Sequence, residues 1–357
     1  MTGWPRTDLC DLLGIEHPII QAPMASATTP ALAAAVSNAG GLGSHGCAAK
    51  TSDQVRADVA ALRDGTNHAF NINFFVHDAP VPNAEDETAM QQRLAPYYAE
   101  LGLGESPAAR SVFPIFGEEM LEVVRELAPP VVSFHFGLPE RDTIETLKEV
   151  GAIILASATT VREAVALEAG GVDAIIAQGW EAGGHRGTFL GGIESGTVGT
   201  FALVPQVADA VRLPVIAAGG IADGRGIAAA FALGASGVQI GTAFLACPEM
   251  QVHPLHRELL LQTRGEATQV TRTISGRPAR AITNRYITEM NESGGELLDF
   301  PLQYSLSGPL NAASREQNST DLMVMWAGQG AALSEVLPAG ELLTKLAEDA
   351  QAVLARM

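Results

Sequence analysis

Residues 214–244 read PVIAAGGIADGRGIAAAFALGASGVQIGTAF, which is two short apolar runs on either side of a helix-like segment. The runs at 214–221 and 237–244 are nearly continuous and contain glycine close to their ends, which is typical of strands buried on both faces of a parallel sheet. The segment between them, 224–233, has the composition of a helix. Because strand, helix and strand in this order form a right-handed βαβ unit, the stretch predicts a parallel sheet.

The same alternation extends over most of the chain. Further apolar runs bounded by glycine or proline predict strands at 18–24, 42–46, 69–75, 131–137, 152–158 and 174–179. Helix-like segments lie between them, at 30–39, 52–64, 141–149, 160–169 and 199–211. Eight such strands favour an α/β fold, a closed (β/α)8 TIM barrel, over an open doubly wound sheet, which needs fewer strands.

Two segments are longer than ordinary connections between a strand and a helix. Residues 80–128 have helical spacing and an excess of acidic residues, which indicates an elaborated third connection. Residues 248–338 separate the eighth strand from a terminal helix at 340–356. We therefore predict a TIM barrel over 1–247, a smaller α+β insertion domain over 248–338 on the substrate side, and a C-terminal helix over 339–357 that completes the barrel.

The composition excludes several classes of function. The 357 residues carry a formal net charge of -18, which repels a nucleic-acid backbone. The three cysteines lie far apart and form no CxxC motif, so we expect neither a disulfide framework nor a metal site. The N-terminal segment lacks the basic start and apolar core of a signal peptide, and glycines interrupt the uncharged run at 226–248, so we expect a cytoplasmic protein without a membrane span.

Glycines follow the last two predicted strands, as the pairs Gly219–Gly220 and Gly241–Thr242. In barrels of this type the loops after the seventh and eighth strands form the usual phosphate site, because bare glycine lets backbone N–H groups approach an anion closely. Alternatively, the glycines are needed only for tight turns between a strand and the next helix. This alternative explains either pair alone, but it explains the presence of both pairs less well. The two pairs therefore predict a phosphate-bearing ligand.

Polar residues end other predicted strands at the same mouth of the barrel. Gln21 and Met24 end the first strand, Asn73 ends the third and Gln178 ends the sixth. A methionine at such a place is more often part of the core than a ligand contact. A buried amide must pair both its donor and its acceptor, and a flavin pyrimidine edge offers partners for both. Asn73 and Gln178 are therefore candidate ligand contacts.

The loop after the sixth strand, QGWEAGGHRGTF at 178–189, places His185 among glycines. A histidine there has room for a ligand beside it, and its pKa is expected near the working range of an enzyme. An imidazole that only caps a loop carbonyl is the alternative. The flanking glycines and the strand-end position favour a catalytic role.

Several of these segments together resemble the nitronate monooxygenase family, once called 2-nitropropane dioxygenases. They are the loop at 178–189 with QAPM at 21–24, NINFF at 71–75, AAGGI at 217–221, QIGTAF at 239–244 and WAGQGA at 326–331. The similarity runs in order over almost the whole chain and includes TRTISGRPARAITNRY at 271–286. The resemblance implies FMN on a TIM barrel, without a metal.

The resemblance also implies roles for individual residues. His185 matches the active-site histidine of the family, which orients the nitronate or takes the α-proton of a neutral nitroalkane. The implied FMN contacts are Met24, Asn73, Gln178, Gly183, Gly220, Gln239, Ile240, Gly241 and Thr242. The commoner family form has glycine in place of Asn71, so either Asn71 or Asn73 faces the flavin, and the strand-end position favours Asn73.

The implied reaction is oxidation of an alkyl nitronate by FMN and O2 to a carbonyl compound and nitrite or nitrate. Whether neutral nitroalkanes also react stays open, as does the oligomeric state, for which a homodimer is one candidate. The alternative is an NAD(P)H-dependent FMN reductase of the same fold, acting on a quinone or an enoyl thioester. The loop with His185, together with WAGQGA, favours the monooxygenase.

A cysteine-dependent dehydrogenase is disfavoured, because no cysteine lies between Cys47 and Cys247.

Overall fold

The computed structural model describes residues 3–357, with only the backbone at residues 193 and 194. Eight parallel strands form one sheet in the order β1-β9-β8-β6-β5-β4-β3-β2. They are β1 (Ile19–Gln21), β2 (Gly43–Gly46), β3 (Phe70–Phe75), β4 (Val131–His135), β5 (Ile153–Ala158), β6 (Ala174–Gln178), β8 (Val215–Ala218) and β9 (Gly237–Ile240). The two ends of this order meet where Leu42, just before β2, bridges Ile20 in β1. The sheet therefore closes into the predicted TIM barrel.

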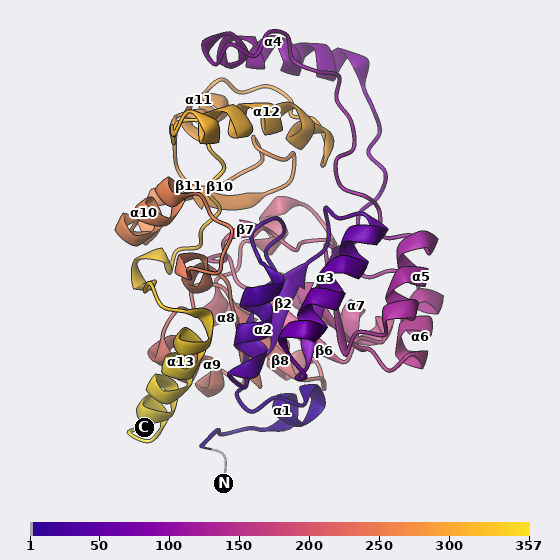
Figure 1. Ribbon diagram of the computed structural model, residues 1–357, viewed down its shortest axis with the longest axis vertical. Helices are drawn as coiled ribbons and strands as arrows, with labels where there is room; N and C mark the ends of the chain where they lie inside the picture. Colours follow the sequence, from indigo (N-terminus) through magenta and orange to yellow (C-terminus); the bar gives the residue numbers. More distant parts are fainter. Residues whose placement is uncertain (1–2) are drawn as a thin grey trace.

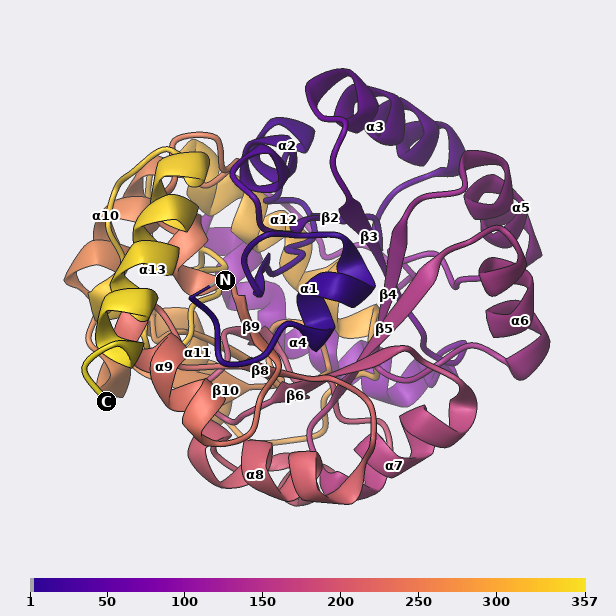
Figure 2. The ribbon, with the colours of Figure 1, turned by 90° about the horizontal axis from the view of Figure 1, so that it is seen from below.

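Helices surround the barrel, as Figure 2 shows. They are α2 (Pro30–Asn38), α3 (Ser52–Gly65), α5 (Glu118–Leu127), α6 (Arg141–Glu149), α7 (Val161–Gly170), α8 (Thr200–Ala210), α9 (Gly224–Ala232) and α13 (Ala339–Leu354). The C-terminal helix α13 packs against both α9 and α2, so it fills the last place in the ring. Among the described residues, no helix has the length and apolar character needed to cross a membrane.

Side chains just before the helices explain where several of them begin. Thr29, Thr51, Thr160 and Asp223 each accept a hydrogen bond from a backbone N–H group in the first turn of the helix that follows. These N–H groups have no partner within the helix, so the contact stabilises the helix end. The caps fix the point at which each chain segment leaves the mouth of the barrel and turns into the outer ring.

The barrel interior changes from apolar to polar along its axis. At the N-terminal end, the inward side chains pack against Leu9 and Leu13 of the short helix α1 (Asp8–Leu13), which lies across the bottom of the barrel in Figure 2. Nearer the C-terminal mouth, Asn71 Nδ2 donates to the hydroxyl groups of Ser44 at 3.1 Å and Ser133 at 2.9 Å. The mouth therefore offers hydrogen-bonding groups above an apolar floor.

Residues 248–338 lie above the C-terminal mouth of the barrel (Figure 1). They contain α10 (Pro254–Gln262), β10 (Thr268–Thr271), β11 (Ala279–Ile282), α11 (Arg285–Glu292) and α12 (Leu302–Glu316). β10 and β11 pair antiparallel, and the other edge of β11 pairs with β7 (Gly184–His185), a two-residue strand in the loop after β6. The insertion and the loop that carries His185 therefore share one small sheet.

The third connection supplies a helix to the insertion as well as one to the barrel. α4 (Ala84–Glu100) packs on α12 and buries Met90, Leu94 and Tyr98 in one cluster with Leu306 and Leu310. Figure 1 shows α4 at the end of the molecule farthest from both termini. We term residues 248–338 together with α4 the cap. The predicted domain boundaries at residues 247 and 338 stay a proposal. The packing of α4 on α12 adds this helix to the proposed insertion domain.

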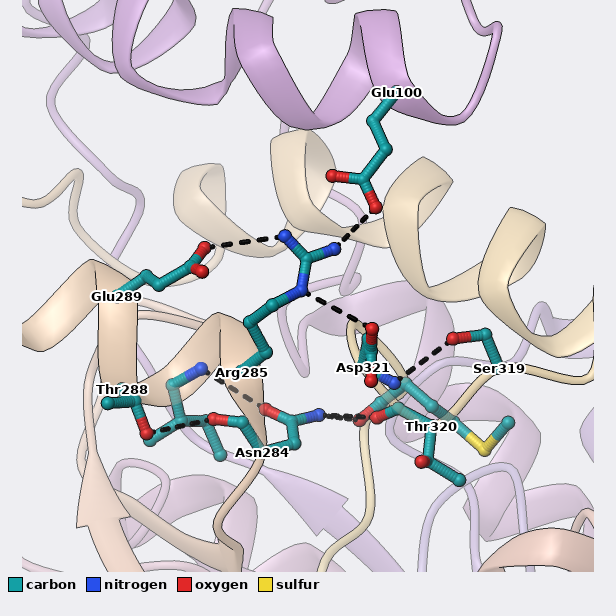
Figure 3. Close-up of polar contacts among 10 residues, drawn as sticks. Glu100, Asn284, Arg285, Thr288, Glu289, Ser319, Thr320 and Asp321 are labelled. Carbon is teal, nitrogen blue, oxygen red and sulfur yellow. Dashed lines mark hydrogen bonds and ion pairs between the residues drawn. The ribbon is translucent and has the colours of Figure 1, made fainter.

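Arg285 joins three segments of the cap (Figure 3). Its guanidinium forms ion pairs with Glu100 at the end of α4, with Glu289 in α11 at 3.6 Å and with Asp321 after α12 at 3.4 Å. All four side chains are partly exposed, so each pair alone contributes little. Together they connect α4 to the chain segments on both sides of α12.

Candidate active site

A cavity of about 300 Å³ lies between the C-terminal mouth of the barrel and the cap. Its upper wall includes Phe113 from the third connection, with Tyr304 and Trp326 from the cap. The predicted site residues that line it are Met24, Asn73, Gln178, Gly183, His185, Gly220, Gln239, Gly241 and Thr242. Ile240 does not line it, because its side chain packs in the apolar layer between the barrel and its helices.

The loops after β8 and β9 expose glycine backbone to one corner of the cavity. These strands correspond to the seventh and eighth strands predicted from the sequence. Gly219 and Gly220 have φ angles of 107° and 73°, in the left-handed region that glycine adopts without strain. Within the described residues, the N–H groups of Gly220, Gly241 and Thr242 donate to no backbone carbonyl. Free N–H groups at the ends of two neighbouring strands can bind an anion.

The WAGQGA segment supports this corner from above. Gly328 N–H donates to Thr242 Oγ1 at 2.9 Å. A Cβ atom on Gly183 would lie 2.5 Å from the nitrogen of Gly328, so these two backbones need glycine to approach so closely. Gln329 N–H also donates to the carbonyl of Glu181 at 2.9 Å. The motif thus packs the end of the cap onto the loop that carries His185.

Two amide side chains at the mouth, those of Gln239 and Asn73, differ in how many of their hydrogen-bonding atoms have a partner. Gln239 Oε1 is buried and has no hydrogen-bond partner among the described residues, a costly state unless a ligand donates to it. Asn73 Nδ2 donates to the carbonyl and the hydroxyl of Ser133, at 3.1 and 2.9 Å. Asn71 lies one layer deeper and does not line the cavity. Of the two asparagines, the structure therefore brings Asn73 to the site.

Gln178 holds the loop of His185 in addition to lining the cavity. Its Nε2 donates to the carbonyl of His185 at 3.0 Å, and its Oε1 accepts from Gly187 N–H at 2.8 Å. The buried Arg186 donates to the carbonyls of Gln178 and Gly196, at 2.9 and 3.0 Å. These contacts fix the loop backbone without using the imidazole of His185.

The imidazole of His185 lies among aromatic rings and contacts the cap. Its Nε2 is 2.9 Å from Ser275 Oγ. Its ring centroid is 5.3 Å from that of Trp326 and 5.6 Å from those of Phe136 and Phe300. Burial lowers the pKa of His185 to about 3, with smaller contributions from nearby positive groups. The expectation of a pKa in the working range was therefore wrong, and the imidazole is neutral at pH 7.

Several residues of the cavity were not predicted from the sequence. His135 in β4 has Nε2 at 3.2 Å from the carbonyl of His185, and burial lowers its pKa to about 4. The sequence signal that could have indicated His135 was a histidine in the mainly apolar run VVSFHFG at 131–137. α12 contributes Tyr304, Asn311 and Arg315 to the cavity, and no motif marks them. Arg315 is the one lysine or arginine among the lining residues that the structure describes.

Neither a cluster of metal-ligating side chains nor a thiol lines the cavity within the described part of the chain. Residues 3–357 contain no group of three or more His, Cys, Asp or Glu side chains arranged to hold a metal ion. The cysteines Cys10, Cys47 and Cys247 are buried and none lines the cavity. A glycine corner for an anion and a neutral histidine under an aromatic wall remain as the main features of the site.

The model of the nitronate monooxygenase family matches residues 6–349 of the chain. The chain belongs to this family. It is 45% identical over 341 residues to the nitronate monooxygenase of Pseudomonas aeruginosa, which covers 95% of this chain and 97% of that protein. The family predicted from the sequence motifs is thereby confirmed.

Two solved structures resemble the chain over almost its whole length. A nitroalkane oxidase from Streptomyces ansochromogenes superposes with a TM-score of 0.90 at 38% identity, over 98% of this chain and 99% of that chain. FabK from Thermotoga maritima superposes less closely, with a TM-score of 0.77 at 33% identity, over 99% and 98% of the two chains. As a member of the nitronate monooxygenase family, the protein is an oxidoreductase of nitronates or nitroalkanes.

Proposed function

We propose that the protein uses FMN and O2 to oxidise alkyl nitronates to carbonyl compounds and nitrite or nitrate. The observation that carries this proposal is the position of His185. The neutral imidazole lines the same cavity as the side-chain-free corner at Gly220 and Gly241. A phosphate-bearing cofactor in that corner and a small substrate near His185 would share one enclosed space.

The residues of the cavity fit FMN. The free N–H groups of Gly220, Gly241 and Thr242 suit its phosphate. The unpaired Oε1 of Gln239 suits an N–H or O–H donor of the cofactor. Met24 presents an apolar, polarisable side chain to the same cavity, and the flat ring of a flavin can pack against such a side chain. When bound, FMN supplies the electron acceptor for the substrate and the reaction with O2.

The protein's own side chains then bind and orient the substrate. A nitronate is an anion that already has the electron pair needed for oxidation, so it requires no base. Arg315 places positive charge at the cavity, which favours entry of an anion into a protein whose net charge is -18. Phe113, Tyr304 and Trp326 form the upper wall and limit the access of water.

Anaerobic flavin reduction tests the proposal against the alternative, an NAD(P)H-dependent reductase. The purified protein is expected to be yellow and to contain one FMN per chain. Ethylnitronate should bleach the flavin absorbance in the absence of O2, and NADH should not. Bleaching by NADH combined with no response to ethylnitronate would support the reductase.

We also propose that the protein acts in the cytoplasm, because its three cysteines are free thiols. A homodimer remains the candidate assembly. Sedimentation of the purified protein would measure its oligomeric state, and fractionation of cells would measure its location.

A further inference from the structure

The cap holds both the backbone and the side chain of His185. In the small sheet, Ala279 of β11 pairs with His185, and Arg280 pairs with Gly184. Ser275, in the turn between β10 and β11, places its Oγ 2.9 Å from Nε2 of the imidazole. Ser275 is fully buried, so water does not compete for this contact. The hydrogen-bond partners of this one hydroxyl therefore determine where the imidazole carries its proton.

Ser275 Oγ has three neighbours and a single proton. It lies 3.1 Å from the carbonyl oxygen of Arg277, and it accepts from the N–H of Arg277 at 3.3 Å. If the hydroxyl donates to this carbonyl, Nε2 of His185 must donate to the hydroxyl, and all three contacts are satisfied.

The opposite assignment leaves a backbone carbonyl without its donor. If the hydroxyl donated to Nε2 of His185, the carbonyl of Arg277 would lose the one donor that the described residues give it. The proton of the imidazole would then be on Nδ1, which faces the cavity. Because the carbonyl of Arg277 would lose its donor beside the fully buried Ser275, this assignment is costly and the Nε2–H form is favoured.

The other imidazole nitrogen is accessible to a ligand. Nδ1 of His185 has no hydrogen-bond partner among the described residues, and it is not among the side-chain atoms that are both buried and unpaired. Since His185 lines the cavity, this places Nδ1 at the cavity surface. A small substrate in the cavity can therefore reach the unprotonated nitrogen.

We propose that Ser275 is a positioning residue that holds His185 as the Nε2–H tautomer, so that Nδ1 accepts the α-proton of a neutral nitroalkane. The proposal rests on the proposed function and on the base role that the family resemblance implies for His185, and it adds Ser275 as the residue that sets the tautomer. In this step the α-carbon–hydrogen bond breaks and an Nδ1–H bond forms. The electron pair stays on the substrate, which becomes the nitronate that is then oxidised.

Ser307 provides a matched control for Ser275. Its buried hydroxyl donates to the carbonyl of Ile274 at 2.6 Å, so it holds the same turn from α12. Within the described structure, it forms no hydrogen bond with His185. Ser275→Ala and Ser307→Ala thus each remove one buried hydroxyl that holds this turn, and only the first change frees the imidazole.

The tautomer can be measured directly by NMR of the flavin-bound protein labelled with 15N-histidine. The chain has eight histidines, and the signals of His185 are identified by their loss in His185→Gln. Long-range couplings between ring nitrogens and carbon-bound protons distinguish the two tautomers. We expect Nε2–H in the unmodified protein and in Ser307→Ala, and a mixture in Ser275→Ala. An Nδ1–H imidazole in the unmodified protein would overturn the proposal, whatever substrates the enzyme oxidises.

Anaerobic flavin reduction by nitroethane and by ethylnitronate tests the consequence for chemistry. With nitroethane, Ser275→Ala should lower the limiting rate about tenfold, the effect of one hydrogen bond, with little change in KM. With ethylnitronate, which has no α-proton to lose, the rate should change by less than about twofold. Ser275→Thr keeps a hydroxyl and should restore the rate with nitroethane.

Other outcomes contradict the proposal in distinct ways. Equal losses in Ser275→Ala and Ser307→Ala, or equal losses with both substrates, would show that Ser275 only supports the fold of the cap. If Ser275→Thr does not fold, the two alanine variants and the NMR spectra still test whether Ser275 sets the tautomer of His185. If neither substrate reduces the flavin of the unmodified protein, the proposed function fails, while the tautomer measurement still tests the role of Ser275.

Discussion

The imidazole Nε2 of His185 and the hydroxyl Oγ of Ser275 lie 2.9 Å apart, although the two residues are 90 positions apart in the sequence. His185 follows a strand of the barrel, whereas Ser275 belongs to the cap. The pairing of β7 with β11 brings them together, because it makes the loop of His185 an edge strand of the cap sheet. A displacement of the cap would therefore also displace the candidate catalytic group.

Gly220→Val should abolish flavin binding without unfolding the protein. Gly220 has a φ of 73°, and a Cβ atom there would lie 3.2 Å from Cβ of Glu181 and would fill part of the proposed phosphate corner. Gly14 has a similar φ of 66°, but a Cβ atom there meets nothing within 4 Å. Gly14→Val is the matched control, since both variants carry the strain of a left-handed side chain, roughly 1–2 kcal/mol.

The measurements for these two glycine variants are flavin absorbance per chain and thermal unfolding. Both proteins should lose comparable stability, and only Gly220→Val should purify largely without flavin. Full occupancy by FMN in Gly220→Val would show that the phosphate binds elsewhere.

Arg315→Gln should slow the reaction of anionic substrates. At low ionic strength, kcat/KM for ethylnitronate should fall about tenfold, because the cavity loses its positive charge. Added salt should lower kcat/KM of the unmodified enzyme toward that of the variant, since it screens the attraction. The exposed Arg264 does not line the cavity, so Arg264→Gln makes the same change in net charge without this effect. A kcat/KM for ethylnitronate that does not depend on salt would exclude electrostatic attraction of the substrate.

Much of the barrel and part of its site could be predicted from the sequence. Strands buried on both faces leave continuous apolar runs such as 152–158, and the residues that end them must lie at one mouth of a parallel barrel. Asn73, Gln178 and His185 could therefore be placed near one another from the chain order alone.

The contributions of the cap could not be predicted in the same way. Ser275 and Arg315 approach the cavity through the fold of an insertion whose elements follow no repeated pattern. The packing of α4 on α12 joins segments from two different connections, and neither connection indicates the contact by itself. The lowered pKa of His185 depends on what surrounds the imidazole, which is a property of the tertiary structure.

His256→Gln should make the protein less sensitive to acid. Burial lowers the pKa of His256 to about 4, below its value of 6.5 in model compounds. Between these pH values the unfolded chain binds a proton that the folded protein excludes, so the free energy of unfolding falls as the pH falls. The steepest slope from one such group is about 1.4 kcal/mol per pH unit, and its full contribution is present above pH 6.5.

Denaturant unfolding between pH 4 and pH 7.5 measures this slope for His256. Glutamine can still donate an N–H to the carbonyl of Trp326, which His256 Nε2 contacts at 3.2 Å. We expect a shallower slope in His256→Gln and an unchanged slope in His68→Gln, because the side chain of His68 is exposed. Identical slopes in all three proteins would show that His256 does not contribute to acid sensitivity.

Arg285→Ala should loosen α4 and leave the barrel unchanged. The variant removes the ion pairs to Glu100, Glu289 and Asp321 that Figure 3 shows. Hydrogen exchange should become faster in α4, while the exchange of β8 and the flavin content should not change. Arg56→Ala removes a comparable exposed pair, with Glu126, on the outside of the barrel and should not affect α4. Equal exchange in α4 of all three proteins would show that the ion pairs of Arg285 do not hold α4 in place.

His185→Ala should fold, keep FMN and lose activity. The loop backbone is held by Gln178, Arg186 and the pairing with β11, and none of these contacts uses the imidazole. Turnover of nitroethane should fall by about 10²–10⁴, the usual contribution of a general base. The loss should be smaller for ethylnitronate, whose α-proton has already left. The measurement is anaerobic flavin reduction by each substrate, in the unmodified protein and in the variant. It distinguishes whether His185 acts as a base or only binds the substrate. Equal rates in the two proteins with both substrates would mean that the histidine serves the structure of the loop and not the chemistry.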